Sequence, residues 1–127
     1  MTRVLCVDDD RLLRMIAKSA FERDTEFSLT MADSAAMALS LVRARAFDLI
    51  LLDVVMPEMD GPALLRALRN EPRAHAIPVA FLTAQTQARD VTRLLELGAI
   101  GVLKKPFNPA TFANEVRALL AKILVPA

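Results

Sequence analysis

Residues 48–61 read DLILLDVVMPEMDG, and within this stretch the apolar run Leu49–Leu52 ends on a carboxylate, Asp53. A charge at the end of an apolar run is costly to bury unless another group pairs with it or reacts with it. Two further apolar runs end in charged residues, VLCVDDD at 4–10 and VLKKPF at 102–107. Because carboxylates and a lysine follow the ends of strand-like runs, the sequence predicts a site for a cation and a phosphate.

Short apolar runs alternate five times with longer stretches that have the period of an amphipathic helix. The runs are Arg3–Val7, Phe27–Met31, Leu49–Leu52, Ile77–Leu82 and Ile100–Leu103. They are almost continuously apolar, which is typical of parallel strands that helices cover on both faces. Strict alternation of strand and helix predicts an α/β fold, a single doubly wound (βα)5 domain with a five-stranded parallel sheet.

Several residues predict where the helices begin and end. Asp10 and the pair Asp33-Ser34 are expected to cap the first and second helices. Asn108 is expected to cap the last helix, with Pro109 at its first position. Gly98 is placed to end the fourth helix in a left-handed conformation. The side chains of that helix expected to face inward are Val91, Leu94 and Leu95.

The composition indicates one domain without a strong overall charge. The chain has 127 residues, with 16 Lys and Arg against 15 Asp and Glu and a net charge of +1, so no overall field attracts nucleic acid or a membrane surface. No apolar run approaches the ~18 residues of a membrane span, and the first strand begins too close to Met1 for a secretory signal. The single cysteine, Cys6, is expected to be a core residue. We therefore expect a cytoplasmic location.

In a doubly wound sheet, ligands bind outside the carboxyl ends of the strands. The polar residues expected there are Asp8, Asp9, Asp10, Asp53, Thr83 and Lys105. Clustered carboxylates either hold protons or bind a hard cation, and Mg²⁺ suits a few carboxylates together with a phosphate oxygen. A hydroxyl and an ammonium can complete a cradle for a phosphoryl group, and an aspartate can itself accept that group. Asp10 is expected to cap a helix rather than to bind the metal.

Five motifs together resemble the receiver domain of the two-component response-regulator family. They are Val7-Asp8-Asp9, Leu52-Asp53, the segment 56–61 (MPEMDG), the segment 81–84 (FLTA) and Lys105-Pro106-Phe107. The motifs have the order and spacing of that family, and the resemblance covers residues 3–123. It implies a flavodoxin-like sheet with strand order 2-1-3-4-5, a receiver domain over residues 1–123 and a C-terminal tail over residues 124–127.

The resemblance also implies a role for each residue of the acidic cluster. Asp53 would accept a phosphoryl group from a phosphohistidine on a sensor histidine kinase or a histidine phosphotransfer protein. Asp9 and Asp53 would ligate Mg²⁺ directly, with Mn²⁺ as a substitute. Asp8 would bind the ion through water, and Val55 through its backbone carbonyl.

Other motif residues would bind the phosphoryl group and transmit the change. Lys105 would pair with Asp53 and then with the phosphoryl group, and the Lys105–Pro106 bond is expected to be cis, as in the family. Thr83, followed by Ala84, would hydrogen-bond a phosphoryl oxygen and pull its loop inward. We interpret the chain as a phosphorylated switch rather than an enzyme, although it would catalyse its own phosphotransfer and a slow dephosphorylation.

The chain departs from the family at positions that govern signal output. The position three before the motif lysine is often aromatic in the family and is Val102 here. A valine has no ring to swing, so the switch is expected to use the loop after Thr83 and the helix near 86–97. In the family, the positions held here by Val55 and Gln85 control how water reaches the acyl phosphate. An apolar Val55 is expected to lengthen the phosphorylated lifetime.

The first helix carries a second strip beside its core-facing stripe, formed by Leu12, Met15 and Ser19. This strip suits docking of a helical partner that bears the phosphohistidine, unless Met15 simply widens the core stripe. The downstream target is expected to be a protein that the sequence does not identify. The 86–123 face is a candidate homodimer surface, and no direct contact with nucleic acid or a membrane is expected.

Two other functions remain open at this point. One is a receiver fold that binds partners without phosphorylation, which the complete set of motif residues argues against and Val102 slightly favours. The other is a phosphatase of the haloacid-dehalogenase-like group, but those enzymes carry a second aspartate where this chain has Val55. Because no second domain follows within these residues, we expect either a stand-alone regulator or a part of a longer protein.

Overall fold

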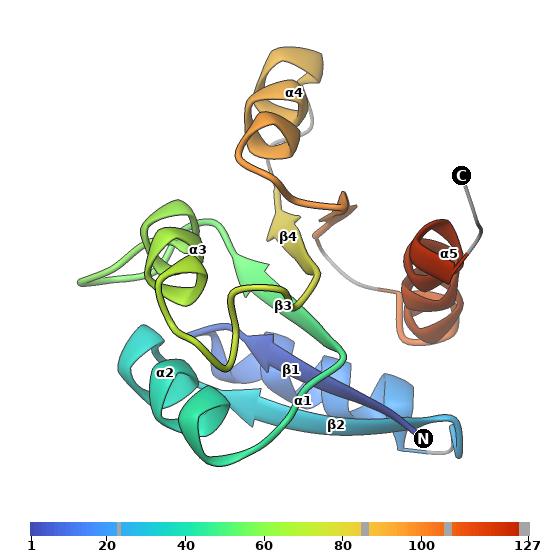
Figure 1. Cartoon of the computed structure of the whole chain (residues 1–127). Coiled ribbons are helices and arrows are strands. Elements are labelled where there is room, and N and C mark those ends of the chain that lie inside the picture. The colour runs from blue at the N-terminus through green and yellow to red at the C-terminus, as the bar shows by residue number, and fades with distance from the viewer. Residues whose placement is uncertain (23, 85–86, 106–107, 125–127) are drawn as a thin grey trace.

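The computed structural model describes residues 1–22, 24–84, 87–105 and 108–124, in which five strands alternate with five helices (Figure 1). The strands are β1 (Thr2–Val7), β2 (Phe27–Ala32), β3 (Leu49–Asp53), β4 (Val79–Thr83) and β5 (Gly101–Lys104). The helices are α1 (Arg11–Phe21), α2 (Ala35–Ala44), α3 (Gly61–Arg69), α4 (Ala88–Glu96) and α5 (Phe112–Leu124). The predicted alternation of strand and helix is therefore confirmed.

All five strands form one parallel sheet in the order β2-β1-β3-β4-β5. This order confirms the predicted flavodoxin-like fold. The fourth strand was expected to begin at Ile77, but it begins at Val79. Pro78 has no N–H to donate to a ladder, and only its carbonyl takes part, accepting from the N–H of Ile50 at 3.0 Å.

Helices lie on both faces of the sheet (Figure 1), and an apolar cluster packs each group of helices against the sheet. Successive side chains of β1 and β3 alternate between the two faces of the sheet. On one face they pack in a cluster with α2, α3 and α4, and on the other face they pack in a cluster with α1 and α5. The second cluster includes edge-to-face contacts of Phe21 with Phe27 and with Phe112. Cys6 lies in the same cluster, and burial raises the pKa of its thiol. The prediction that Cys6 is a core residue is confirmed.

The predicted ends of three helices are confirmed. Asp10 Oδ1 accepts hydrogen bonds from the N–H groups of Leu12 and Leu13, and Ser34 Oγ accepts one from Met37. After α4, Gly98 has a φ of 106°, which a residue with a Cβ rarely adopts.

Two expectations about the helices were wrong. The last helix begins at Phe112 rather than Pro109, because Asn108 caps a separate turn: its side chain accepts from Ala110 N–H, and its carbonyl accepts from Phe112 N–H. In α4, Leu94 is buried but Leu95 is 42% exposed. A helix of nine residues with one neighbouring cluster buries a narrow stripe, and Leu95 lies at its margin.

No helix within the described ranges is both long and apolar enough to cross a membrane.

Candidate functional site

Three strands and the segment that follows β5 bring the predicted polar residues to one edge of the sheet. Asp8 directly follows β1, Asp53 ends β3 and Thr83 ends β4, whereas Lys105 directly follows β5. The backbone fixes these positions, since Asp8 N–H donates to Ala32 O at 3.0 Å and Lys105 N–H donates to Thr83 O at 2.9 Å. Residues almost a hundred positions apart in the sequence therefore share one site.

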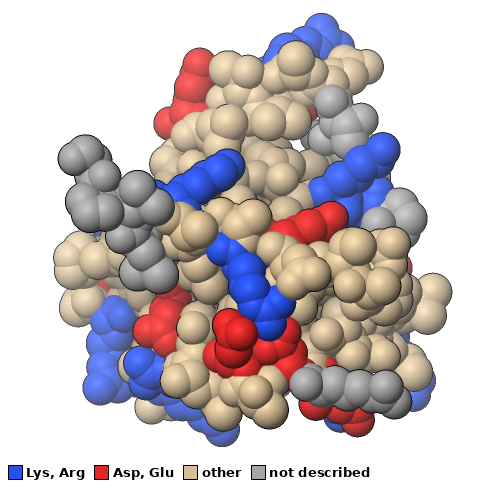
Figure 2. All heavy atoms as spheres, turned by 90° about the vertical axis from the view of Figure 1, so that its right-hand side faces the viewer, with Lys and Arg blue, Asp and Glu red and all other residues tan. Residues whose placement is uncertain are grey.

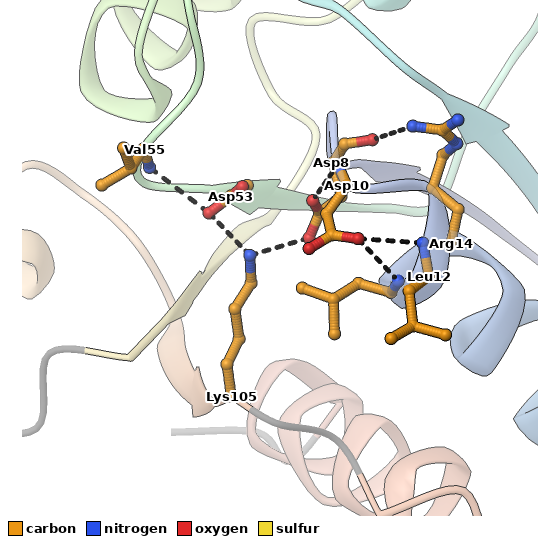
Figure 3. A network of polar contacts seen from close by, with 8 residues as sticks. Asp8, Asp10, Leu12, Arg14, Asp53, Val55 and Lys105 are labelled. Carbon is orange, nitrogen blue, oxygen red and sulfur yellow. Dashed lines mark hydrogen bonds and ion pairs between the residues drawn. The ribbon is translucent and has the colours of Figure 1, made fainter.

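The centre of the site is the ammonium of Lys105, which bridges two carboxylates (Figure 3). Lys105 Nζ lies 2.8 Å from Asp8 Oδ2 and 2.9 Å from Asp53 Oδ1. Asp53 Oδ1 also accepts a hydrogen bond of 3.3 Å from the N–H of Val55. Both of these contacts use Oδ1, so that, among the described residues, Oδ2 of Asp53 is the oxygen left available for chemistry.

The carboxylates are held in a water-poor position. Asp8, Asp53 and Thr83 are the buried polar residues of the described chain. Burial raises the pKa of Asp53 to about 6, and the charge of Asp8 adds to this rise, while the Lys105 ammonium and the Val55 N–H oppose it. Burial alone would lower the pKa of Lys105, but hydrogen bonds to Asp8 and Asp53 and their charges raise it. The lysine is therefore a permanent cation, and Asp53 ionises less readily than an ordinary aspartate.

Asp8, Asp9 and Asp53 each offer a carboxylate oxygen, and these oxygens lie within 4.8 Å of one another. Asp8 Oδ2 is buried and pairs with Lys105 Nζ at 2.8 Å. A hard divalent cation with oxygen ligands fits such a donor set. Asp10 does not join it, because its side chain caps α1 as expected.

The loop between β3 and α3 contains two features that sequence reasoning missed. Gly61 N–H donates to Val54 O at 2.9 Å, and a Cβ on Gly61 would lie 2.4 Å from the carbonyl oxygen of Asp53. Glu58 has a φ of 69°, in the left-handed region that favours glycine. The MPEMDG motif predicted a loop here, but the close approach of Gly61 to Asp53 depends on the path of the backbone.

A third contact was also absent from the sequence-based expectations. Arg14 Nη1 donates a hydrogen bond of 3.0 Å to the backbone carbonyl of Asp8 (Figure 3). The arginine lies on α1, one turn after the acidic motif, and the sequence offers no signal that its side chain turns back toward β1. It holds the segment that carries Asp8 against the first helix.

A cavity of about 400 Å³ opens onto these groups. It is lined by Asp9, Asp10, Asp53, Val54, Val55, Thr83, Ala84 and Lys105. Val55 also lines this cavity, and its side chain is 69% exposed. The cavity thus brings together the predicted phosphoacceptor Asp53, the carboxylate of Asp9, and the predicted hydroxyl and lysine.

The remaining predicted residues lie outside this cavity. Leu12 and Met15 are 64% and 60% exposed, and Ser19 is also exposed, so none of the three belongs to the core. Val102 is half-buried and packs against the cluster that contains α3 and α4. The predicted cis bond involves Pro106, and that residue, like Gln85, lies outside the described residues.

Comparison with known proteins places this fold and site in one family. Residues 4–117 match the response regulator receiver domain. The chain is 39% identical over 122 residues to the transcriptional regulatory protein CpxR of Escherichia coli, and 37% identical over 121 residues to the transcriptional regulatory protein CseB of Streptomyces avermitilis. These matches cover 96% and 95% of this chain and 50% of each relative. The chain thus spans about half the length of these curated relatives.

Comparison with solved structures also finds receiver domains and related response regulators. The chemotaxis protein CheY4 of Vibrio cholerae is 30% identical, with a TM-score of 0.84 over 94% of this chain and 98% of that one. A receiver domain of a histidine kinase from Syntrophus aciditrophicus is 33% identical, with a TM-score of 0.79 over 100% of this chain and 96% of that one. Receiver domains of this shape therefore occur in proteins of different overall organisation. By sequence, fold and the residues at the strand ends, this chain belongs to the response regulator receiver domain family.

Proposed function

We propose that this chain is a phosphorylation-controlled switch in which Asp53 accepts a phosphoryl group from a histidine kinase or a histidine phosphotransfer protein. The position of Lys105 carries the proposal, because its ammonium lies within 2.9 Å of carboxylates of both Asp8 and Asp53. One cation shared by two buried carboxylates, with Asp9 beside them, leaves an excess of negative charge. Such a site favours a bound divalent cation and a group that can be drawn to the lysine.

The phosphoryl transfer would use the free oxygen of Asp53. Oδ1 is held by Lys105 and by the N–H of Val55, so Oδ2 would attack phosphorus. The new O–P bond forms as the N–P bond of the phosphohistidine breaks, and the imidazole nitrogen keeps the electron pair and takes a proton from solvent. Lys105 and the hydroxyl of Thr83 would then hold phosphoryl oxygens, which is the positioning on which phosphoryl transfer depends.

The acidic cluster suits Mg²⁺, with Mn²⁺ as a substitute, and Asp8, Asp9 and Asp53 would hold the ion. When bound, the ion supplies neutralisation of the charge on the transferring phosphoryl oxygens. The carboxylate oxygens of Asp8, Asp9 and Asp53, which lie within 4.8 Å of one another, support this assignment. The backbone carbonyl of Val55 is proposed as a further ligand.

The conformational response would pass through the backbone that joins the ends of β4 and β5. Lys105 N–H donates to Thr83 O, so a lysine that follows the phosphoryl group pulls on the strand that carries the threonine. Val102 offers no ring to move between two positions, and it packs against the core instead. We therefore propose that the segment after Thr83, rather than a side-chain rotation at 102, carries the change toward α4.

The phosphoryl donor is proposed to dock on the exposed strip of α1 formed by Leu12, Met15 and Ser19. Exposure of the two apolar members supports this surface. The switch would act in the cytoplasm on a protein target, and the 86–123 face remains a proposed homodimer surface, on which Arg89, Arg93 and Glu96 are exposed.

Intact-protein mass spectrometry tests the proposal directly. The wild-type chain is incubated with acetyl phosphate and Mg²⁺, and we expect the mass of one phosphoryl group to be added. Asp53→Asn should remain unmodified, whereas Glu96→Gln, which neutralises an exposed carboxylate at the end of α4, should be modified as wild type. A wild-type chain that is not modified, or a modified Asp53→Asn variant, would refute the assignment of Asp53.

A matched experiment in cells separates a switch from a phosphorylation-independent binding module. If phosphorylation controls the output, Asp53→Ala abolishes the response to the cognate signal while the protein remains folded. An unchanged response would favour the binding module.

A further inference from the structure

A groove separate from the proposed phosphorylation site runs along the β2 edge of the sheet. It has a volume of about 570 Å³ and lies between α1, β2 and the residue that follows α2. This volume falls in the range of ligand-binding clefts. Its floor is apolar and is formed by Met15, Leu29 and Met31; of these, Met15 also belongs to the strip of α1 on which the phosphoryl donor is proposed to dock.

The rim of the groove is strongly cationic. Arg11, Arg14, Lys18 and Arg45 line it, and no Asp or Glu lines it in the described part of the chain. Arg14 is engaged with the Asp8 carbonyl. The side chains of the other three are exposed and, among the described residues, form no hydrogen bond or ion pair. On the side of the molecule where α5 and the N-terminus lie, by contrast, acidic and basic side chains are interspersed (Figure 2).

Within the described part of the chain, the backbone along the groove is unpaired on one side. Among those residues, β2 pairs with β1 and with no second strand. Glu26 O accepts from Thr2 N–H and Ala32 O accepts from Asp8 N–H, so even-numbered residues of β2 turn their backbone groups toward β1. In a parallel ladder the residues between them turn outward. The N–H and C=O groups of Leu29 and Met31 therefore point along the groove.

We propose that this groove binds an extended acidic peptide segment of a partner protein, which adds to the sheet as a strand beside β2. The peptide backbone would pair with Leu29 and Met31, as in other cases where a strand is added to a sheet edge. Its acidic side chains would meet Arg11 and Lys18 on one face and Arg45 on the other. Charge complementarity selects an acidic segment, and the open backbone edge selects an extended one.

The same cations could have a purely protective role. Charged side chains beside an edge strand prevent pairing with a second copy of the same chain. In that case, reversing the charges would cause self-association and would leave peptide binding unaffected. The groove volume and its apolar floor favour an occupant, and the experiment separates the two roles.

The test measures binding of fluorescein-labelled octapeptides in which Glu or Asp alternates with Val, Thr or Phe. Fluorescence anisotropy should detect binding by at least one acidic peptide, weaker at high salt, and no binding by the matching Lys peptide. The double variant Arg11→Glu/Lys18→Glu should weaken binding about tenfold. The matched control Arg89→Glu/Arg93→Glu, on α4, should not.

Two further readouts identify the binding mode. Hydrogen exchange followed by NMR should show new protection at the amides of Leu29 and Met31, and a peptide N-methylated at alternate residues should lose binding. The proposal is overturned if no acidic peptide binds below about 1 mM, or if binding survives the Arg11/Lys18 reversal. It is also overturned if β2 amides remain unprotected, or if the reversal only causes self-association. If duplex DNA or anionic vesicles bind with the same dependence on Arg11 and Lys18, the ligand of the groove belongs to another class and the peptide proposal is overturned.

Discussion

Replacing Asp53 by asparagine is expected to stabilise the metal-free protein at neutral and alkaline pH. The carboxylate lies in a buried cluster with Asp8, and one lysine serves both. The pKa of Asp53 is raised from 3.8 to about 6, a shift of about 2 units. At 1.36 kcal/mol per unit, the ionised form costs about 3 kcal/mol relative to an unperturbed carboxyl. Since the cavity opens to water on one side, screening reduces the expected gain to about 1–2 kcal/mol.

The sign follows from proton linkage. The folded state holds the Asp53 proton more tightly than the unfolded chain, so it binds more protons between about pH 4 and pH 6. The contribution of this group to stability is therefore present at low pH and lost as the pH rises through about 6. The side chain of the Asp53→Asn variant has no charge at any of these pH values, and the difference between variant and wild type should shrink toward pH 4.

Urea unfolding followed by circular dichroism measures the effect, with EDTA present, at pH 8 and near pH 4. A matched control is Glu96→Gln, an exposed carboxylate whose change should alter stability by less than about 0.5 kcal/mol. Added Mg²⁺ should stabilise wild type far more than Asp53→Asn. Equal or lower stability of Asp53→Asn at pH 8, or a gain that does not depend on pH, would show that Asp53 is not held under electrostatic strain.

Four other predictions concern two glycines, the left-handed residue Glu58 and the metal. Gly61→Ala places a Cβ 2.4 Å from the Asp53 carbonyl oxygen, so we expect a loss of about 2–3 kcal/mol in urea unfolding and slower phosphorylation. Gly98→Ala, strained only by its φ of 106°, should cost about 1 kcal/mol and leave phosphorylation unchanged. Glu58→Gly relieves a left-handed residue and should raise the free energy of unfolding by about 1 kcal/mol; an unchanged midpoint in urea would contradict this. The apparent Mg²⁺ affinity, measured by calorimetry, should fall as the pH drops below about 6, because protonation of Asp53 competes with the ion.

The strand ends were the most predictable part of the molecule. Each apolar run stops where the chain leaves the sheet, and in a parallel sheet these ends meet at one edge. Asp8, Asp53, Thr83 and Lys105 could therefore be grouped without coordinates. The helix caps were equally readable, because Asp10 and Ser34 act on backbone groups only two or three residues away.

The sequence-based predictions were wrong or incomplete where contacts between residues far apart in the sequence determine the structure. Asn108 is a good capping residue, but it caps a turn. The helix begins only at Phe112, whose side chain is buried in the core. Leu95 has the spacing of a core residue and lies at the margin of a short helix. The groove beside β2 unites α1 with Arg45, residues with no common motif. No sequence pattern predicts the close approach of Gly61 to Asp53 either, because this contact depends on the path of the loop.

The lysine at the centre of the site also ties together strands that are not neighbours. Two strands, β3 and β4, separate β1 from β5, yet Lys105 reaches Asp8 across both of them. The carboxyl edge of the sheet thus carries a cross-brace made of side chains, in addition to its ladder of backbone hydrogen bonds. A change of charge at Asp53 therefore acts on Lys105, and through Lys105 it affects both Asp8 at the end of β1 and the end of β5.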